Sequence, residues 1–71
     1  MDAQGYRVVI EPIGNEEGGG FLATVPELAG CISDGETRQE ALANVEDAIQ
    51  TWIWAARSMG RPIPVPSMAH H

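Results

Sequence analysis

The chain has 71 residues, of which 44% are apolar and 20% charged. This length allows one small domain and argues against tandem-domain architectures. Ten acidic residues against four basic ones give a formal net charge of −6, which repels phosphate backbones and anionic membrane surfaces. The composition therefore argues against direct nucleic-acid binding and favours a basic protein partner, although a surplus of carboxylates also keeps small proteins soluble.

Cysteine usage and the N-terminal residues indicate the compartment. Cys31 is the single cysteine, so it cannot form an internal disulfide, and no Cys and His spacing typical of a metal site occurs. The first residues lack the basic and apolar regions of a secretory signal, and no stretch approaches the ~18 apolar residues of a membrane span. We expect a cytoplasmic protein with no membrane segment and no metal or other cofactor.

Three segments in the first half of the chain have the composition of β-strands. Residues 6–13 alternate apolar and polar side chains, residues 21–25 form a second extended run, and residues 31–33 form a short third one. The glycine-rich stretch 14–20 predicts a hairpin with a flexible tip, and residues 33–35 predict a turn. Together they predict a three-stranded antiparallel sheet.

A long amphipathic helix follows. Thr37 and Glu40 match a capping box, in which the Thr37 hydroxyl accepts from the Glu40 N–H and the Glu40 carboxylate returns to the Thr37 N–H. Gly60 is placed to end the helix as a left-handed cap. One apolar stripe at helical spacing predicts packing across the sheet, and it comprises Ala41, Leu42, Val45, Ala48, Ile49, Trp52, Ile53 and Ala56.

The last segment has proline at every second position from 62 to 66. Because proline lacks the backbone N–H, a central strand is excluded, and residues 61–66 are predicted to form a short edge strand. The alternative is a polyproline II ligand for an aromatic groove. The predicted fold is therefore α+β with the order β-β-β-α-β, in one domain over residues 1–66. We expect residues 67–71 to be a disordered tail, whose two histidines are either a metal-binding pair or a remnant of a tag.

The residues offer little for catalysis. The only histidines are the last two residues, so no nucleophile–base set can form inside the fold, and Cys31 is interpreted as a small buried hydrophobe. The plentiful reactive groups are carboxylates such as Glu11, Asp34 and Glu36. Converging on a divalent metal, they would make a nuclease, but the strand alternation places no three of them at the centre of one sheet face.

Trp54 is the strongest candidate for a contact residue. It lies about 180° from the apolar stripe on a helical wheel, among small or polar neighbours, so a core position does not explain it. We interpret it as a binding anchor at a protein–protein contact. The alternative is a ring lying flat on neighbouring aliphatic stems. The thin core of so short a chain also predicts a homo-oligomer, either a dimer or a tetramer.

Acidic residues expected in turns are the second set of candidates. Glu27, Asp34 and Glu36 are predicted to contact a partner, because loops are exposed and commonly carry binding residues. The equally weighted alternative is that they are solvated turn residues.

Several ordered pieces of the sequence resemble the HicB-like antitoxin family. They span residues 6–66 and are Tyr6-Arg7-Val8-Val9-Ile10-Glu11, Gly20-Phe21-Leu22-Ala23-Thr24-Val25-Pro26-Glu27-Leu28, Gly30-Cys31, Gly35-Glu36-Thr37, Glu40-Ala41-Leu42-Ala43-Asn44, Gly60 and Pro62-Ile63-Pro64. The chain departs from the family pattern at Ala29, where proline is usual, and at Glu36, where aspartate is usual.

The resemblance implies a partly degenerate RNase H-like fold and a bacterial antitoxin that neutralises a HicA toxin, a small basic ribonuclease. Opposite charge would speed association with such a partner. Family antitoxins commonly carry a second, DNA-binding module, which we do not expect in a chain that ends at His71. Two alternatives stay open: a metal-dependent RNase H-like nuclease, and a solitary homo-oligomeric domain without a toxin partner.

Overall fold

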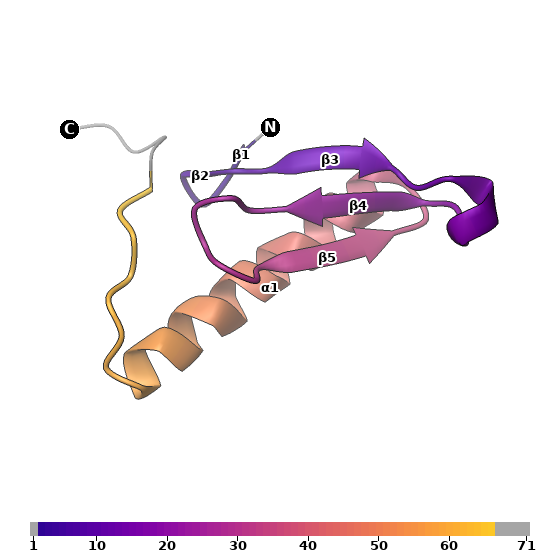
Figure 1. Cartoon of the computed structure of the whole chain (residues 1–71). Coiled ribbons are helices and arrows are strands. Elements are labelled where there is room, and N and C mark those ends of the chain that lie inside the picture. The colour runs from indigo at the N-terminus through magenta and orange to yellow at the C-terminus, as the bar shows by residue number, and fades with distance from the viewer. Residues whose placement is uncertain (1, 67–71) are drawn as a thin grey trace.

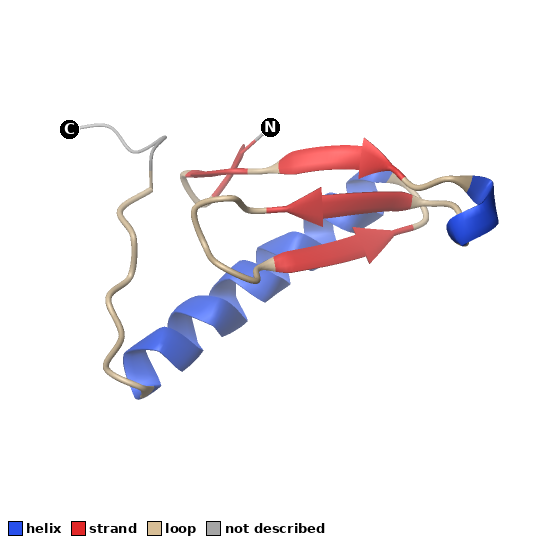
Figure 2. Ribbon diagram, in the orientation of Figure 1, coloured by secondary structure: helices blue, strands red, loops and turns tan. Residues whose placement is uncertain are grey.

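The computed structural model describes residues 2–66. Three strands form one antiparallel sheet in the order β3-β4-β5, and a single long helix lies across one face of it (Figures 1 and 2). This confirms the predicted α+β architecture. The elements in chain order are β1 (Asp2–Ala3), β2 (Tyr6–Arg7), β3 (Val9–Pro12), the 3-10 turn η1 (Asn15–Glu17), β4 (Phe21–Thr24), β5 (Ile32–Gly35) and α1 (Arg38–Ser58).

The first predicted strand is two strands, and a third one precedes it. β2 and β3 are separated at Val8, and β1 pairs with β2 in a small hairpin of its own. The hairpin turn is made by Gln4 at φ 55° and Gly5 at φ 86°. Two consecutive residues with positive φ are the geometry that a two-residue hairpin needs, but Gln4 is not a usual residue there, so composition did not reveal the turn.

The third predicted strand is shifted toward the helix. It spans Ile32–Gly35 rather than residues 31–33, so the predicted turn over residues 33–35 is strand instead. The reason is pairing: Ser33 and Gly35 lie opposite Ala23 and Phe21 of β4. Ladder hydrogen bonds to β4 thus outweigh the local turn preference of an Asp-Gly pair.

Gly35 has a second role, because the helix passes very close to it. A Cβ built on Gly35 would lie 2.9 Å from the Cα of Ala41 and 2.8 Å from the carbonyl carbon of Glu40. Real Cβ contacts are not that short, so only glycine lets β5 and the first turn of α1 approach to this distance. The site fixes the helix against the sheet edge.

Both termini of the helix are capped largely as predicted. The Thr37 hydroxyl accepts from the Glu40 N–H at 3.0 Å, which confirms the N-cap. The returning carboxylate of Glu40, however, accepts from the N–H of Glu36 at 2.9 Å rather than from that of Thr37. At the other end Gly60 adopts φ 69°, and the Arg61 N–H donates to the Ala56 carbonyl at 2.8 Å, the pattern of a Schellman cap.

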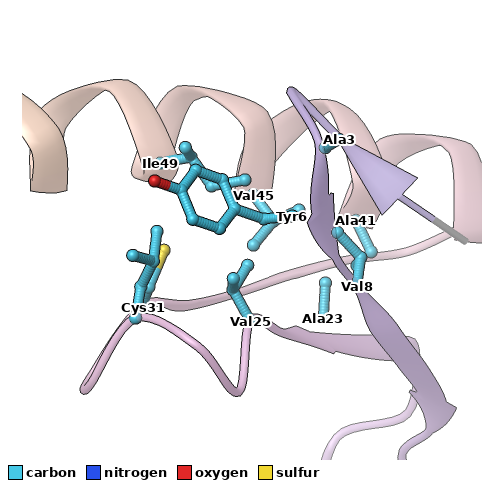
Figure 3. Close-up of a cluster of buried hydrophobic side chains, with 10 residues drawn as sticks. Ala3, Tyr6, Val8, Ala23, Val25, Cys31, Ala41, Val45 and Ile49 are labelled. Carbon is cyan, nitrogen blue, oxygen red and sulfur yellow. The ribbon is translucent and has the colours of Figure 1, made fainter. Parts of the chain in front are cut away.

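The core lies between the helix and the inner sheet face. Figure 3 shows the Tyr6 ring between the two layers, beside Val45 and Ile49. The predicted apolar stripe is confirmed: Ala41, Val45, Ile49 and Ala56 are buried, and Leu42, Ala48, Trp52 and Ile53 pack partly buried against the core. Leu28, which the sequence placed only in a turn, lies in the β4–β5 loop and is fully buried as part of the core.

The predicted edge strand over residues 61–66 does not form. This segment carries no strand within the described chain and instead runs back past the end of the sheet as an extended trace (Figure 1). The helix carries the start of the segment past the end of the sheet, so the segment does not run along a sheet edge of its own chain (Figure 1). It is held by a hydrogen bond from the Tyr6 hydroxyl to the Pro64 carbonyl at 2.6 Å. The tail predicted for residues 67–71 lies outside the described residues.

Candidate interaction surface

Trp54 lies on the solvent side of α1, as the helical wheel predicted. Its side chain is 70% exposed, and its wheel neighbours Ala43, Asp47, Gln50 and Ser58 are exposed as well. Trp52, two residues earlier, is only partly exposed and donates its indole N–H to the Ala29 carbonyl at 2.8 Å. The two tryptophans therefore differ: one fastens the helix to the β4–β5 loop, and the other has a large apolar surface facing solvent.

Glu27 is engaged within the fold. Its carboxylate accepts a hydrogen bond from the Arg7 N–H at 2.9 Å, and the side chain is half-buried. The bond ties the β4–β5 loop to β2. Burial raises the pKa of Tyr6, and the nearby negative charge of Glu27 raises it further. The sequence predicted an exposed loop acid here and gave no signal for this tie.

Asp34 and Glu36 lie together near the glycine-rich hairpin tip. They line one hollow of about 290 Å³, whose other lining residues are Gly18, Gly19, Gly20, Gly35, Glu40 and Asn44. Asp34 pairs with Leu22 of β4, so it is a strand residue and not the turn residue that was predicted. Both acids are exposed. The structure thus brings these two predicted residues together and places Glu27 at the opposite end of β4.

The acidic residues do not form a metal cluster in the described part of the chain. No group of three or more His, Cys, Asp or Glu side chains there is arranged to hold a metal ion. Cys31 is buried, as predicted, and burial raises the pKa of its thiol, which makes it a poor nucleophile.

The open face of the sheet is a surface that the sequence analysis missed. Opposite the helix, the strand register aligns Val9, Thr24 and Ile32 in one row and Glu11, Leu22 and Asp34 in the next. Ile32 is 52% exposed and Val9 is exposed too. A signal was present in the sequence: Val9, Leu22 and Ile32 are apolar at strand positions that face solvent. A sheet with one solvated face normally alternates apolar and polar residues more strictly.

The open face therefore places an apolar row beside a row that carries two carboxylates, those of Glu11 and Asp34. Val9 also lines a hollow of about 360 Å³ with Arg7, Pro26 and Glu27. Two copies facing each other through this surface would bring four carboxylates together, whereas a basic protein would neutralise them.

No helix in the described chain is long and apolar enough to cross a membrane.

Comparison with known proteins finds one family model and several relatives. Residues 6–71 match the family model described as the HicB_like antitoxin of bacterial toxin-antitoxin systems. A UPF0150 protein of Thermoplasma acidophilum is 36% identical over 59 residues, which cover 83% of this chain and 81% of that protein. A UPF0150 protein of Synechocystis is 37% identical over 59 residues, covering 83% of this chain and 71% of the relative. No solved structure matches the chain significantly.

Proposed function

The chain belongs to the HicB-like antitoxin family of bacterial toxin-antitoxin systems, and on that premise we propose that it is a non-catalytic module that binds and neutralises a small basic HicA-like ribonuclease. The family match, which covers nearly the whole chain, is the observation that carries the proposal. We further propose that residues 1–66 are one HicB-like domain with a degenerate RNase H-like fold, acting in the cytoplasm without a cofactor.

Charge and surface support a basic partner. The net charge of −6 would speed encounter with a cationic protein and repel RNA. On the open sheet face, Glu11 and Asp34 flank Leu22 next to the exposed apolar row that includes Ile32. Such a face offers apolar burial at its centre and carboxylates for Lys and Arg at its rim, which is the usual anatomy of a protein interface.

Individual residues take different parts in this proposal. Trp54 acts as an apolar anchor, because a large exposed aromatic loses much water-accessible surface on binding. Asp34 and Glu36, together at the hairpin tip, contact basic side chains. Glu27 contributes charge while it holds the β4–β5 loop in place through Arg7. We also propose that the chain forms a homo-oligomer, a dimer or a tetramer, whose contacts compensate for a small core.

The test is co-expression with a small basic HicA-like ribonuclease. We expect the toxin alone to arrest growth, and the pair to restore growth and co-purify. Asp34→Asn and Glu36→Gln together should weaken the complex. The affinity of this double variant should also fall less with rising salt concentration than that of the wild type, because fewer charge pairs remain to be screened. Glu46→Gln, on the helix, is the matched control. Persistent arrest with a folded chain present would refute the proposal.

A further inference from the structure

The two edges of the three-stranded sheet differ in what covers them. On β5 the outward carbonyl of Asp34 accepts a hydrogen bond from the Asn44 side chain at 2.7 Å, and α1 packs chiefly against this strand. Asn44 and the packed helix therefore obstruct this edge for another strand.

The β3 edge is open in the described chain. The Ile13 N–H donates to the Gly20 carbonyl at 2.8 Å, and Glu11 lies opposite Leu22, so the backbone groups of Glu11 and Ile13 face β4. Because neighbouring residues of a strand face opposite ways, the N–H and carbonyl of Ile10 and the carbonyl of Pro12 point away from β4. β1 pairs with β2 and with no other strand. These three backbone groups, two acceptors and one donor, therefore face no neighbouring strand.

Residues 61–66, which we call the proline segment, have a matching row of backbone groups. Its N–H groups belong to Arg61, Ile63 and Val65, and that of Arg61 already bonds to the Ala56 carbonyl. The Pro64 carbonyl points to the other side and accepts from Tyr6. Residues that precede proline are restricted to extended conformations, and proline itself has a fixed φ. The segment is therefore a stiff strand with its free donors two residues apart along one edge, and ordering it on a partner costs little entropy.

We infer that the proline segment of one copy adds as an antiparallel strand to the β3 edge of a second copy, with Val65 opposite Ile10 and Ile63 opposite Pro12. In this register Val65 and Ile10 exchange two hydrogen bonds, and the Ile63 N–H donates to the Pro12 carbonyl. Pro12, which has no N–H, is then required only to accept. The inference rests on the homo-oligomer proposed above and does not depend on toxin binding.

Side-chain burial favours the same register. Strand alternation places Ile10 on the helix side of the sheet, and a residue opposite it in an antiparallel ladder projects to the same side. Val65, which is 78% exposed, would therefore pack beside Ile10. The helix covers β3 least of the three strands, so this place has room for Val65 and Ile63. None of the four paired residues is charged, and Glu11 projects to the other face.

Replacing a donor by proline tests the inference without changing the apolar character of the segment. Ile63→Pro and Val65→Pro each remove an N–H that no neighbouring strand uses within the described chain, so the monomer should keep its helical circular dichroism. We expect each to raise the dissociation constant of the dimer about tenfold or more, measured by light scattering across a dilution series. Ile63→Val and Val65→Ile, which keep the N–H, are the controls and should leave the constant within about threefold of the wild type.

A second measurement reads the register directly. In a dimer that combines labelled and unlabelled copies, isotope-filtered NMR should show contacts between Ile10 of one copy and Val65 of the other, with slow exchange of both amide protons. A monomer at every concentration, or amide protection of Val65 within a monomer, overturns the inference. A dimer that the proline variants leave intact also overturns the inference. If Trp54→Ala then abolished that dimer, the contact between copies would lie on the helix. Toxin binding by the proline variants is a separate readout, whose loss would bear on the proposed function alone.

Discussion

The two halves of the helix are attached to the rest of the molecule in different ways. The first part, residues 38–49, which we call the first half, lies directly on the sheet, with Ala41 packed against the backbone of Gly35 and with Val45 and Ile49 completely buried. The second half, residues 50–58, extends past the sheet (Figure 1). It is held by the buried Ala56, by the partly buried Trp52 and Ile53, and by the hydrogen bond from the Trp52 indole N–H to the Ala29 carbonyl.

The difference separates stability from recognition. Close packing makes Ala41, Val45 and Ile49 unavailable to a partner, because every change of volume at these positions disturbs the core. The second half retains a largely exposed Trp54 and an exposed Met59, and the proline segment that follows it has an exposed edge. We therefore expect substitutions of the buried residues and of Trp52 to affect folding, and substitutions of the exposed Trp54 and Met59 to affect association.

Gly35→Ala should have the largest effect. The added methyl group has no space against Glu40 and Ala41, so the helix must move off β5, and we expect a loss of about 3 kcal/mol or failure to fold. Urea unfolding followed by circular dichroism measures it. Gly14→Ala is the control, because its nearest atom is the flexible Glu17 carboxylate at 3.4 Å. Equal stability of the two variants would contradict the close approach.

Trp52→Phe should come next. The change removes the indole N–H and leaves the Ala29 carbonyl without its partner, so we expect a loss of about 1.5 kcal/mol from the hydrogen bond and the smaller ring. The matched control is Trp54→Phe, the same substitution on the exposed face, which should cost less than about 0.5 kcal/mol. Similar costs at both positions would mean that the two tryptophans do not differ as described.

Tyr6→Phe should cost about 1 kcal/mol, because it removes the bond that holds Pro64. It should also change the response to alkali. The pKa of Tyr6 is raised above 10.0 by burial and by the charge of Glu27, so the folded state holds this proton more tightly than the unfolded state. That stabilisation is complete below pH 10 and is lost as pH rises through the folded pKa.

The comparison of Tyr6→Phe with the wild type isolates this effect. Burial also raises the pKa of the Cys31 thiol above its ordinary 9.0, but Cys31 is present in both proteins and contributes equally. Unfolding free energies measured from pH 8 to pH 11 should therefore converge toward high pH as the wild type loses its advantage. A constant difference across that range would show that the Tyr6 hydroxyl titrates alike in both states.

Trp54→Ala should have the smallest effect on folding. Because the side chain is 70% exposed, we expect the unfolding free energy to change by less than about 0.5 kcal/mol. Binding to the toxin or to a second copy should weaken by about 2 kcal/mol or more if Trp54 is the anchor, as measured by calorimetry. Unchanged affinity for both partners would leave Trp54 as an exposed residue without a contact role.

Features set by local chemistry were predictable from the sequence. The Thr37 cap, the Gly60 cap and the apolar stripe of α1 depend on neighbouring residues or on helical spacing, and all three are observed. The exposed position of Trp54 followed from the same spacing.

Features set by distant contacts were not predictable. The β5 register depends on β4, the bond from Arg7 to Glu27 crosses 20 positions, and the bond from Tyr6 to Pro64 crosses 58. The prediction of an edge strand over residues 61–66 was wrong for the same reason. Whether these residues pair with a strand depends on which edge of a sheet lies within reach, and no local pattern encodes that distance.

We propose that this chain acts by binding a ribonuclease and does no chemistry itself. The most direct measurement is cleavage of labelled RNA by a small basic HicA-like ribonuclease, with the purified chain titrated in and Mg²⁺ present. We predict that cleavage falls to background when the chain reaches stoichiometric equivalence, and that the chain alone leaves the RNA intact. Undiminished cleavage at excess chain, or cleavage by the chain alone that Glu11→Ala abolishes, would contradict the claim.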